Sequence, residues 1–294
     1  MSDRETMVRG DAAGTTGAAP ALAFQGVTFS YGAAAGGARV RSGAAEGTRS
    51  STQAPLINGL TLEIPADRVT GIVGPNGCGK STLLKLADGL LEPQAGTILV
   101  AGAAVSALSA RERARRVALL PQIHRTPSMT VRSLVMCGRY AHMGVFGRPT
   151  AEDERAVDAA LAEVGIADLA QKPARRLSGG ERQRAFIAMA VAQEAGLLLL
   201  DEPTTYLDVR AAFETMALVR ELGACRRMTA VAVVHDLDLA LRTCDDIVVM
   251  ERGGVVAHGA AEDPQVRETI GRVFGVTIAV VDTPQGRAYA TFPR

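Results

Sequence analysis

The sequence contains no tryptophan, 4% aromatic residues and only four cysteines in 294 positions. Its cysteines (Cys78, Cys137, Cys225 and Cys244) are widely separated and form no CxxC pair, which points to neither a disulfide framework nor a zinc site. No apolar run approaches the roughly 20 residues of a membrane-spanning helix. The amino-terminal segment also lacks the apolar block of a secretory signal. We therefore expect a chain that does not cross the bilayer and keeps reduced thiols in the cytosol.

Charge of one sign is also lacking, because 32 basic and 31 acidic residues leave a formal net charge of +1. This balance provides no global field that would recruit nucleic acid or an anionic membrane surface. We therefore expect no nucleic-acid partner, and any polyanion must be held by a local site. The length and the 47% hydrophobic content suffice for one large core with an appended subdomain.

Strand-like and helix-like segments alternate along most of the chain. Apolar runs at 69–73, 197–200 and 228–234 are each followed by a helical pattern. This alternation predicts an α/β fold with a largely parallel sheet covered by helices. Residues of about 123–177 break the rhythm and suggest helix upon helix, with Thr150 as the cap of one of them. We interpret this stretch as a helical subdomain inserted into the α/β core.

Three segments carry little or no periodic signal. Residues 1–21 are small and polar and predict a disordered tail, and residues 32–53 predict a long flexible loop between two strand-like segments. Residues 276–294 form an extension whose short alternating stretches, separated by Pro284 and Gly286, are compatible with a hairpin. The main domain is thereby predicted at 22–275.

A glycine-rich loop, GPNGCGKS at 74–81, fits the pattern GxxxxGK[ST] between an apolar strand and a helical segment. Its backbone N–H groups can converge on phosphate oxygens only where side chains do not block the approach. Lys80 would supply charge to the outer phosphates, and the Ser81 hydroxyl would coordinate Mg²⁺; Cys78 is interpreted as a small tolerated residue. The alternative is a glycine-rich turn that matches by chance. The predicted ATP-binding residues of this loop are Gly74, Pro75, Asn76, Gly77, Cys78, Gly79, Lys80, Ser81 and Thr82.

Two carboxylates end the apolar run LLLLDE at 197–202. The carboxyl edge of a parallel sheet is where strands present residues to a ligand. Asp201 is predicted to hold Mg²⁺ through water and Glu202 to act as the general base on the attacking water. An acidic turn after a core strand is the alternative.

The segment LSGGE at 177–181 precedes a helical pattern and lies just upstream of LLLLDE. Taken alone, Ser178, Gly179 and Gly180 indicate a helix start that either binds an anion or is simply capped. At this point the chain resembles the ABC ATPases, for which such a segment in this order is characteristic. Further segments extend the resemblance over about residues 22–260.

Four further residues match family motifs in family order. Gln122 resembles the glutamine of the Q-loop, a magnesium ligand; His235 resembles the switch histidine at the γ-phosphate; Asp208 follows Leu207 as in the D-loop. Tyr31 resembles the aromatic residue that stacks on adenine, although the long loop after it departs from the family pattern. Their alternatives are a strand-end cap, a core histidine, a helix cap and packing, respectively.

The resemblance implies a P-loop NTPase core of ABC type with an antiparallel β subdomain. It also implies that ATP is bound between two chains, so that the partner's nucleotide meets a second set of residues: Leu177, Ser178, Gly179, Gly180, Glu181 and Asp208. Lys80, Glu202 and His235 would then be catalytic, ATP and Mg²⁺ the cofactors, and Ser81, Gln122 and Asp201 the magnesium ligands. The expected partner is a second copy or a similar ATPase subunit.

Segments such as TVRSLVMCGRY and LSGGERQRAFIAMAVAQE look most like importer ATPases for ferric siderophores, with haem and cobalamin systems as close relatives. This implies integral membrane permeases as partners, a solute-binding protein as an indirect one, and a peripheral location at the cytoplasmic face of the membrane. Two other classes remain open. They are a soluble ABC protein of DNA repair or translation, and a P-loop kinase or GTPase.

Overall fold

The computed structural model describes residues 19–32, 55–122, 126–143, 147–284 and 286–294. Residues 1–18 of the predicted tail and residues 33–53 of the predicted flexible loop lie outside these ranges. Ala21, the last residue of the predicted tail, lies within the described residues, and its amide donates to the Ile64 carbonyl at 3.0 Å, at the edge of the first strand pair.

The central sheet has the strand order β10-β9-β3-β8-β7-β6. All neighbours are parallel except β10, which pairs antiparallel with β9. The prediction of a largely parallel sheet is therefore confirmed. The strands are β3 (Val69–Val73), β6 (Val117–Leu120), β7 (Leu197–Asp201), β8 (Thr229–Val233), β9 (Asp246–Glu251) and β10 (Gly254–Ala260).

Strand β7 shows why four consecutive leucines form a strand here. Leu198 and Leu200 belong to the hydrophobic core on one face of the sheet, whereas Leu197 and Leu199 belong to the core on the other. Successive side chains of a strand point to opposite faces, so a strand covered on both sides needs an unbroken apolar run.

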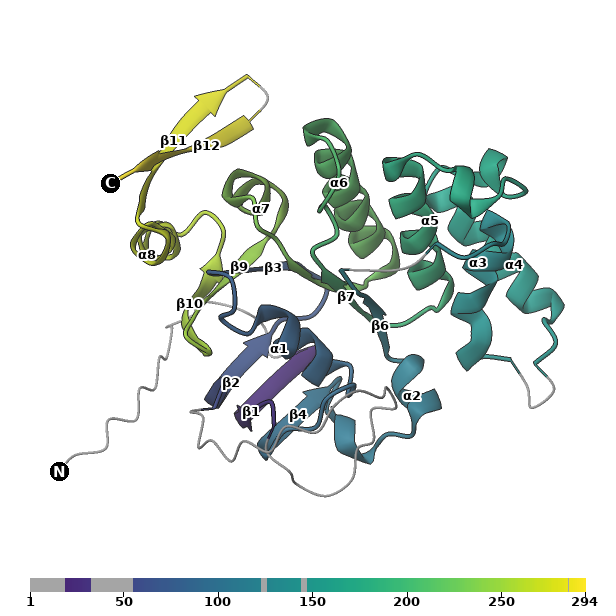
Figure 1. The fold of residues 1–294 in the computed structure, drawn as a ribbon, viewed down its shortest axis with the longest axis horizontal. Coiled ribbons are helices and arrows are strands. Elements are labelled where there is room, and N and C mark those ends of the chain that lie inside the picture. The colour runs from purple at the N-terminus through teal and green to yellow at the C-terminus, as the bar shows by residue number, and fades with distance from the viewer. Residues whose placement is uncertain (1–18, 33–54, 123–125, 144–146, 285) are drawn as a thin grey trace.

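One face of the central sheet is covered by α1 (Lys80–Ala87) and by an antiparallel sheet of order β2-β1-β4-β5 (Figure 1). Phe24 of β1, Leu83 of α1 and Leu199 of β7 share the core between them. The helix α2 (Ala110–Ala114) then leads into β6. The antiparallel strands are β1 (Leu22–Phe29), β2 (Ile57–Ile64), β4 (Ala95–Val100) and β5 (Ala103–Ala104).

Four helices among the described residues cover the opposite face of the sheet. They are α5 (Gly179–Ala192), α6 (Val209–Arg226), α7 (Leu237–Thr243) and α8 (Pro264–Phe274). Within the described part of the chain, no helix combines the length and the apolar character needed to cross a membrane.

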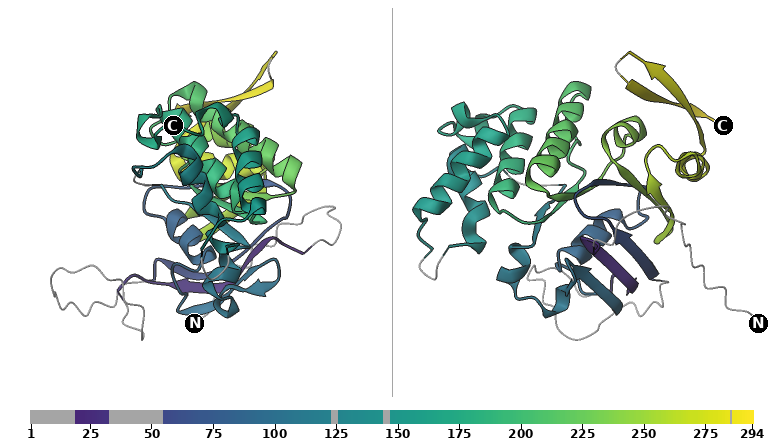
Figure 2. Two further views of the ribbon diagram at one scale, coloured as in Figure 1. Left: turned by 90° about the vertical axis from the view of Figure 1, so that its right-hand side faces the viewer. Right: turned by 180° about the vertical axis from the view of Figure 1, so that it is seen from behind.

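The segment between β6 and α5 forms helices α3 (Val131–Met136) and α4 (Ala151–Glu163), together with short 3₁₀ turns. Thr150 caps α4 as predicted, accepting a hydrogen bond from the Asp153 amide. A bridge between Thr130 and Pro173 holds the two ends of the segment together. Helices α3 and α4 lie at one end of the molecule, as Figure 2 shows. The domain limits at 22 and 275 and the subdomain limits at about 123–177 stay predictions.

The last residues form the expected hairpin of β11 (Val276–Thr283) and β12 (Gly286–Pro293). One face of the hairpin packs on the protein through Tyr289, which is buried and whose amide donates to the Asp238 carboxylate of α7 at 2.7 Å. The hairpin therefore lies beside the helix that follows His235.

Candidate functional site

The loop GPNGCGKS leaves the carboxyl end of β3 and enters α1, as the sequence predicts. A Cβ atom on Gly74 would lie 2.3 Å from the Met250 carbonyl oxygen, so no side chain fits there. Gly79 has φ of 107° and begins α1 without a side-chain cap. The first amides of α1 are thus not capped by a side chain, and the helix dipole gives this end partial positive charge.

Lys80 is buried, and its ammonium donates to the carbonyl oxygens of Gly74 at 2.7 Å and Pro75 at 3.0 Å. These bonds fold the lysine back over its own loop. The next residue, Ser81, donates from its hydroxyl to Asp201 Oδ1 at 2.8 Å, which joins the loop to the end of β7. Burial raises the pKa of Asp201, against the lowering effect of the Ser81 hydrogen bond.

Two further residues of the predicted set flank the loop. Cys78 is buried, and burial raises the pKa of its thiol, which makes the nucleophilic thiolate scarce. Tyr31 is 54% exposed, stacks edge-on against Phe29 with centroids 4.9 Å apart, and bonds through its hydroxyl to the Thr82 hydroxyl at 3.1 Å. Its ring therefore lies beside the first turn of α1, and about half of the residue's surface remains exposed.

Glu202 is held by three side chains. His235 Nε2 lies 2.6 Å from Oε1, while the Gln122 amide at 2.5 Å and the Thr205 hydroxyl at 3.0 Å donate to Oε2. Burial raises the pKa of Glu202, but the hydrogen bonds from His235 and Thr205 outweigh it, and the pKa lies below its ordinary value. The carboxylate is therefore ionised at neutral pH, the form in which it can accept a proton.

The LSGGE segment begins α5. Ser178 is the N-cap and forms a capping box with Glu181, whose carboxylate accepts from the Ser178 amide at 2.7 Å. Lys172 lies 3.3 Å from Glu181, and the buried Leu177 precedes the cap. A methyl group on Gly179 would lie 3.7 Å from Leu207 Cδ2, in ordinary contact.

Asp208 caps α6, accepting from the Ala211 amide at 2.8 Å. This is the helix-cap alternative that the sequence leaves open for this residue. The cap places Leu207, the residue before it, against the start of α5.

The predicted residues thus fall into two groups. One group lies around the carboxyl ends of β3, β6, β7 and β8 and comprises the phosphate loop, Asp201, Glu202, Gln122 and His235. The other joins the LSGGE segment to residues 206–208. Within the described ranges, no hydrogen bond or ion pair links the phosphate loop to LSGGE.

A pocket lies between the two groups, which we call the α5 pocket. Gln122, Glu202 and Thr205 line it from one side, and Gly179, Arg182 and Gln183 of α5 line it from the other. Thr205, Arg182 and Gln183 were not among the residues predicted from the sequence. Thr205 was detectable as a hydroxyl three residues after Glu202, whereas the two α5 residues carry no signal that separates them from ordinary helical positions.

Comparisons with known proteins agree with this geometry. Residues 57–205 match the family described as ABC transporter. The ferric enterobactin transport ATP-binding protein of Escherichia coli is 42% identical over 226 residues, covering 76% of this chain and 83% of that protein. The iron(3+)-hydroxamate import ATP-binding protein of Bacillus subtilis is 39% identical over 231 residues, covering 78% and 86%.

Among solved structures, CbiO1 from Clostridium perfringens, part of the ABC transporter complex CbiONQ, matches with a TM-score of 0.71. Its sequence is 27% identical, and the match covers 87% of this chain and 94% of that one. The similarity therefore extends over nearly all the elements that position the site.

Proposed function

Because this chain belongs to the ABC transporter family, whose ATP-binding subunits hydrolyse ATP to drive transport, we propose that it powers an importer of ferric siderophores. The proposal of ATP hydrolysis rests on one observation: three side chains hold the Glu202 carboxylate in place beside the phosphate loop. The cargo rests on the relatives, which the ferric enterobactin and iron(3+)-hydroxamate proteins exemplify. Haem and cobalamin are the competing cargoes.

ATP would bind along the phosphate loop, with backbone amides and Lys80 on its phosphates and Tyr31 against its adenine. Lys80 is already aimed at the inside of the loop, where it donates to main-chain carbonyls that a phosphate would replace as acceptors. Ser81 and Asp201 place a hydroxyl and a carboxylate oxygen 2.8 Å apart at this loop, which suits the oxygen preference of Mg²⁺. Gln122 would complete this set; when bound, the ion would neutralise phosphate charge.

Glu202 would orient and deprotonate the attacking water as general base. His235 and Thr205 hold the carboxylate in place, and His235, whose side chain is 44% exposed, would itself reach the γ-phosphate. The role of these side chains is to keep Glu202 ionised and correctly placed, since catalysis depends on the preorganised geometry of such groups.

The separation of the phosphate loop from LSGGE supports a dimer in which each chain completes the other's site. Uncapped amides at the start of α1 and the glycines at the start of α5 would approach one triphosphate from two polypeptides. A second copy of this chain is the simplest partner. Closure on ATP and opening after hydrolysis would then move the attached permeases.

The permeases would be integral membrane proteins, with a solute-binding protein delivering the cargo to them. This assigns the chain to the cytoplasmic face of the membrane as a peripheral subunit. Recognition of the iron chelate itself would lie with those partners.

The substitution Glu202→Gln tests the enzymatic proposal. Because the amide cannot accept a proton, we expect kcat of the purified protein with Mg-ATP to fall about 10²- to 10⁴-fold. ATP should still bind, so the variant should accumulate as a closed dimer in size-exclusion chromatography with light scattering. Glu268→Gln, at an exposed carboxylate of α8, is the matched control and should change neither. Unchanged hydrolysis by Glu202→Gln would remove this residue as the base.

The same pair of variants tests the cargo in cells that hold the matching permeases and binding protein. Uptake of a radiolabelled ferric siderophore should stop with Glu202→Gln and persist with Glu268→Gln. Uptake of cobalamin or haem that depends on Glu202, with no siderophore uptake, would replace the proposed cargo and leave the ATPase assignment intact.

A further inference from the structure

Gln183 is a polar residue buried on helix α5. It lies on α5 with 9% of its surface exposed, and its amide nitrogen is fully buried and has no hydrogen-bond partner among the residues that the structure describes. Burying an unpaired amide donor costs free energy that an apolar side chain of the same size would not. Such a cost in a native core needs a reason.

The position of Gln183 on its helix relates it to both groups of site residues. It follows Gly179 by four residues, so the two lie on one face of α5. Both line the α5 pocket, and Glu202 and Thr205 line it from the opposite side. The same helical face therefore carries a glycine of LSGGE at one turn and, at the next turn, Gln183, which lines the pocket together with Glu202.

The segment opposite Gln183, residues 202–207, is the glutamate turn. Glu202 and Tyr206 have φ of 55° and 68°, a conformation that side chains other than glycine adopt only with strain. Tyr206 is 88% exposed, so little packing resists its movement. Leu207, at the end of the turn, lies beside Gly179 at the start of α5, where a Cβ atom on the glycine would be 3.7 Å from Leu207 Cδ2. A displacement of α5 would therefore also displace the glutamate turn.

We propose that Gln183 is a positioning residue of the ATPase cycle, whose amide donates to a main-chain carbonyl oxygen of the glutamate turn when ATP closes the dimer. The proposal rests on the dimeric site described above. ATP bound at the LSGGE segment in one site would thereby position Glu202 in the other site, because one turn of α5 separates Gly179 from Gln183. Gln183 stays unpaired until then, and its amide gains a bond only in the closed dimer.

The comparison with Gln193, at the opposite end of α5, separates this role from ordinary packing. The Gln193 amide donates to the carbonyl oxygens of Ala114 at 2.5 Å and Val117 at 2.8 Å. Gln193 is thus a partnered structural glutamine on the same helix. It provides the matched control for a substitution that removes the amide.

The test compares Gln183→Leu and Gln193→Leu in the full chain with Mg-ATP. For Gln183→Leu we expect the melting temperature without nucleotide to be unchanged or raised, because an unpaired donor is lost. Its kcat should fall roughly 2- to 30-fold with little change in KM. The Hill coefficient for ATP should move toward that of independent sites. Gln193→Leu should instead lower the melting temperature.

Each result of the test bears on the proposal. A wild-type kcat and Hill coefficient in Gln183→Leu would overturn it, as would a lowered melting temperature with KM and kcat changed together. Loss of folding in both Gln183→Leu and Gln183→Met would also overturn it. In a structure of the ATP-bound Glu202→Gln dimer, the Gln183 amide should reach a carbonyl of residues 202–207, and an unpaired amide there counts against it. If the wild type hydrolyses ATP normally, such results leave the proposed function standing.

Discussion

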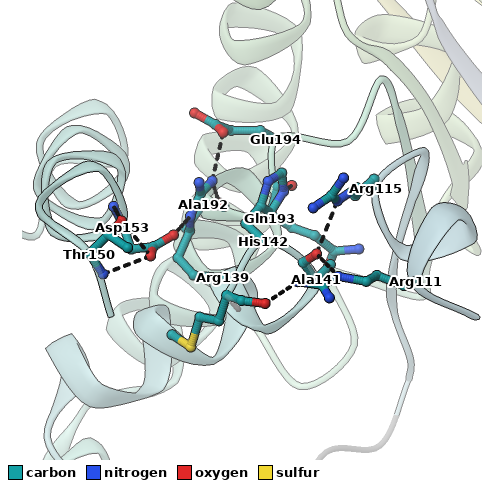
Figure 3. Close-up of polar contacts among 11 residues, drawn as sticks. Arg111, Arg115, Arg139, Ala141, His142, Thr150, Asp153, Ala192, Gln193 and Glu194 are labelled. Atoms are coloured by element: carbon teal, nitrogen blue, oxygen red, sulfur yellow. Dashed lines mark hydrogen bonds and ion pairs between the residues drawn. The ribbon is translucent and has the colours of Figure 1, made fainter. Parts of the chain in front are cut away.

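The two ends of helix α5 differ in how well their polar groups are satisfied. At the carboxyl end, Arg139 is 2% exposed and donates to Asp153 at 3.0 Å, to Glu194 at 2.6 Å and to the Ala192 carbonyl at 2.7 Å (Figure 3). Toward the amino end, the Gln183 amide nitrogen has no hydrogen-bond partner within the described part of the chain, and the neighbouring turn is strained. The well-bonded end indicates a structural anchor, and the incompletely bonded end indicates a place where binding or movement changes the contacts.

The carboxyl end of α5 also fixes several other segments. His142 bonds to the Gln193 carbonyl at 2.8 Å, and Arg111 and Arg115 both donate to the Ala141 carbonyl (Figure 3). Gln193 in turn holds the connection between α2 and β6. The helical segment and the central sheet therefore share one anchor, and α5 extends from it toward LSGGE. Because a helix is a rigid element, a displacement of its free end turns the whole helix about the anchored end.

The largest expected effect on stability comes from breaking the anchor with Arg139→Met. The substitution leaves Asp153, with 4% of its side chain exposed, as a buried carboxylate without its cation. We expect the free energy of unfolding to fall by about 3–5 kcal/mol in urea denaturation. Arg210→Met, in an exposed pair with Glu214, is the control and should leave the denaturation midpoint in place. Equal midpoints for the two variants would contradict the anchor.

The pH dependence of the Arg139→Met defect sharpens the same comparison. Burial raises the pKa of Asp153, but hydrogen bonds from Thr150 and Arg139 bring it below its ordinary value, so the wild type loses this contribution only in strong acid. Without Arg139 the pKa of Asp153 should rise. The variant's deficit should then be greatest near about pH 7 and shrink toward about pH 5, where a protonated Asp153 tolerates burial. A deficit that is constant with pH would assign the loss to packing alone.

The smallest effect is expected at the caps of two helices. Ser178→Ala at the start of α5 and Ser109→Ala at the start of α2 both remove the serine of a capping box. Each should lower the free energy of unfolding by about 1 kcal/mol. Only Ser178→Ala should also weaken ATP-dependent dimerisation, measured by light scattering of the Glu202→Gln background. Equal dimerisation of both variants would reduce Ser178 to a cap.

Much of the fold and of the candidate site could be predicted from the sequence, because it depends on local chemistry. The strand-to-helix context of GPNGCGKS, the run LLLLDE and the cap at Thr150 all lie where the sequence placed them. Each depends on residues close in the chain: apolar runs for buried strands, glycines for a tight loop, and a hydroxyl for a helix cap. The contacts of Glu202 were less accessible, because Gln122 and His235 reach it from distant strands.

By itself, the sequence determined the order of the elements, the phosphate loop, and the identity of the two carboxylates, because these follow from periodicity and short-range motifs. The tertiary structure alone decided that Glu202 is held from three directions, that Arg139 is buried as an anchor and that the Gln183 amide nitrogen finds no partner in the described ranges. Whether a polar side chain finds a partner depends on which segments pack around it, and that packing joins residues far apart in the chain.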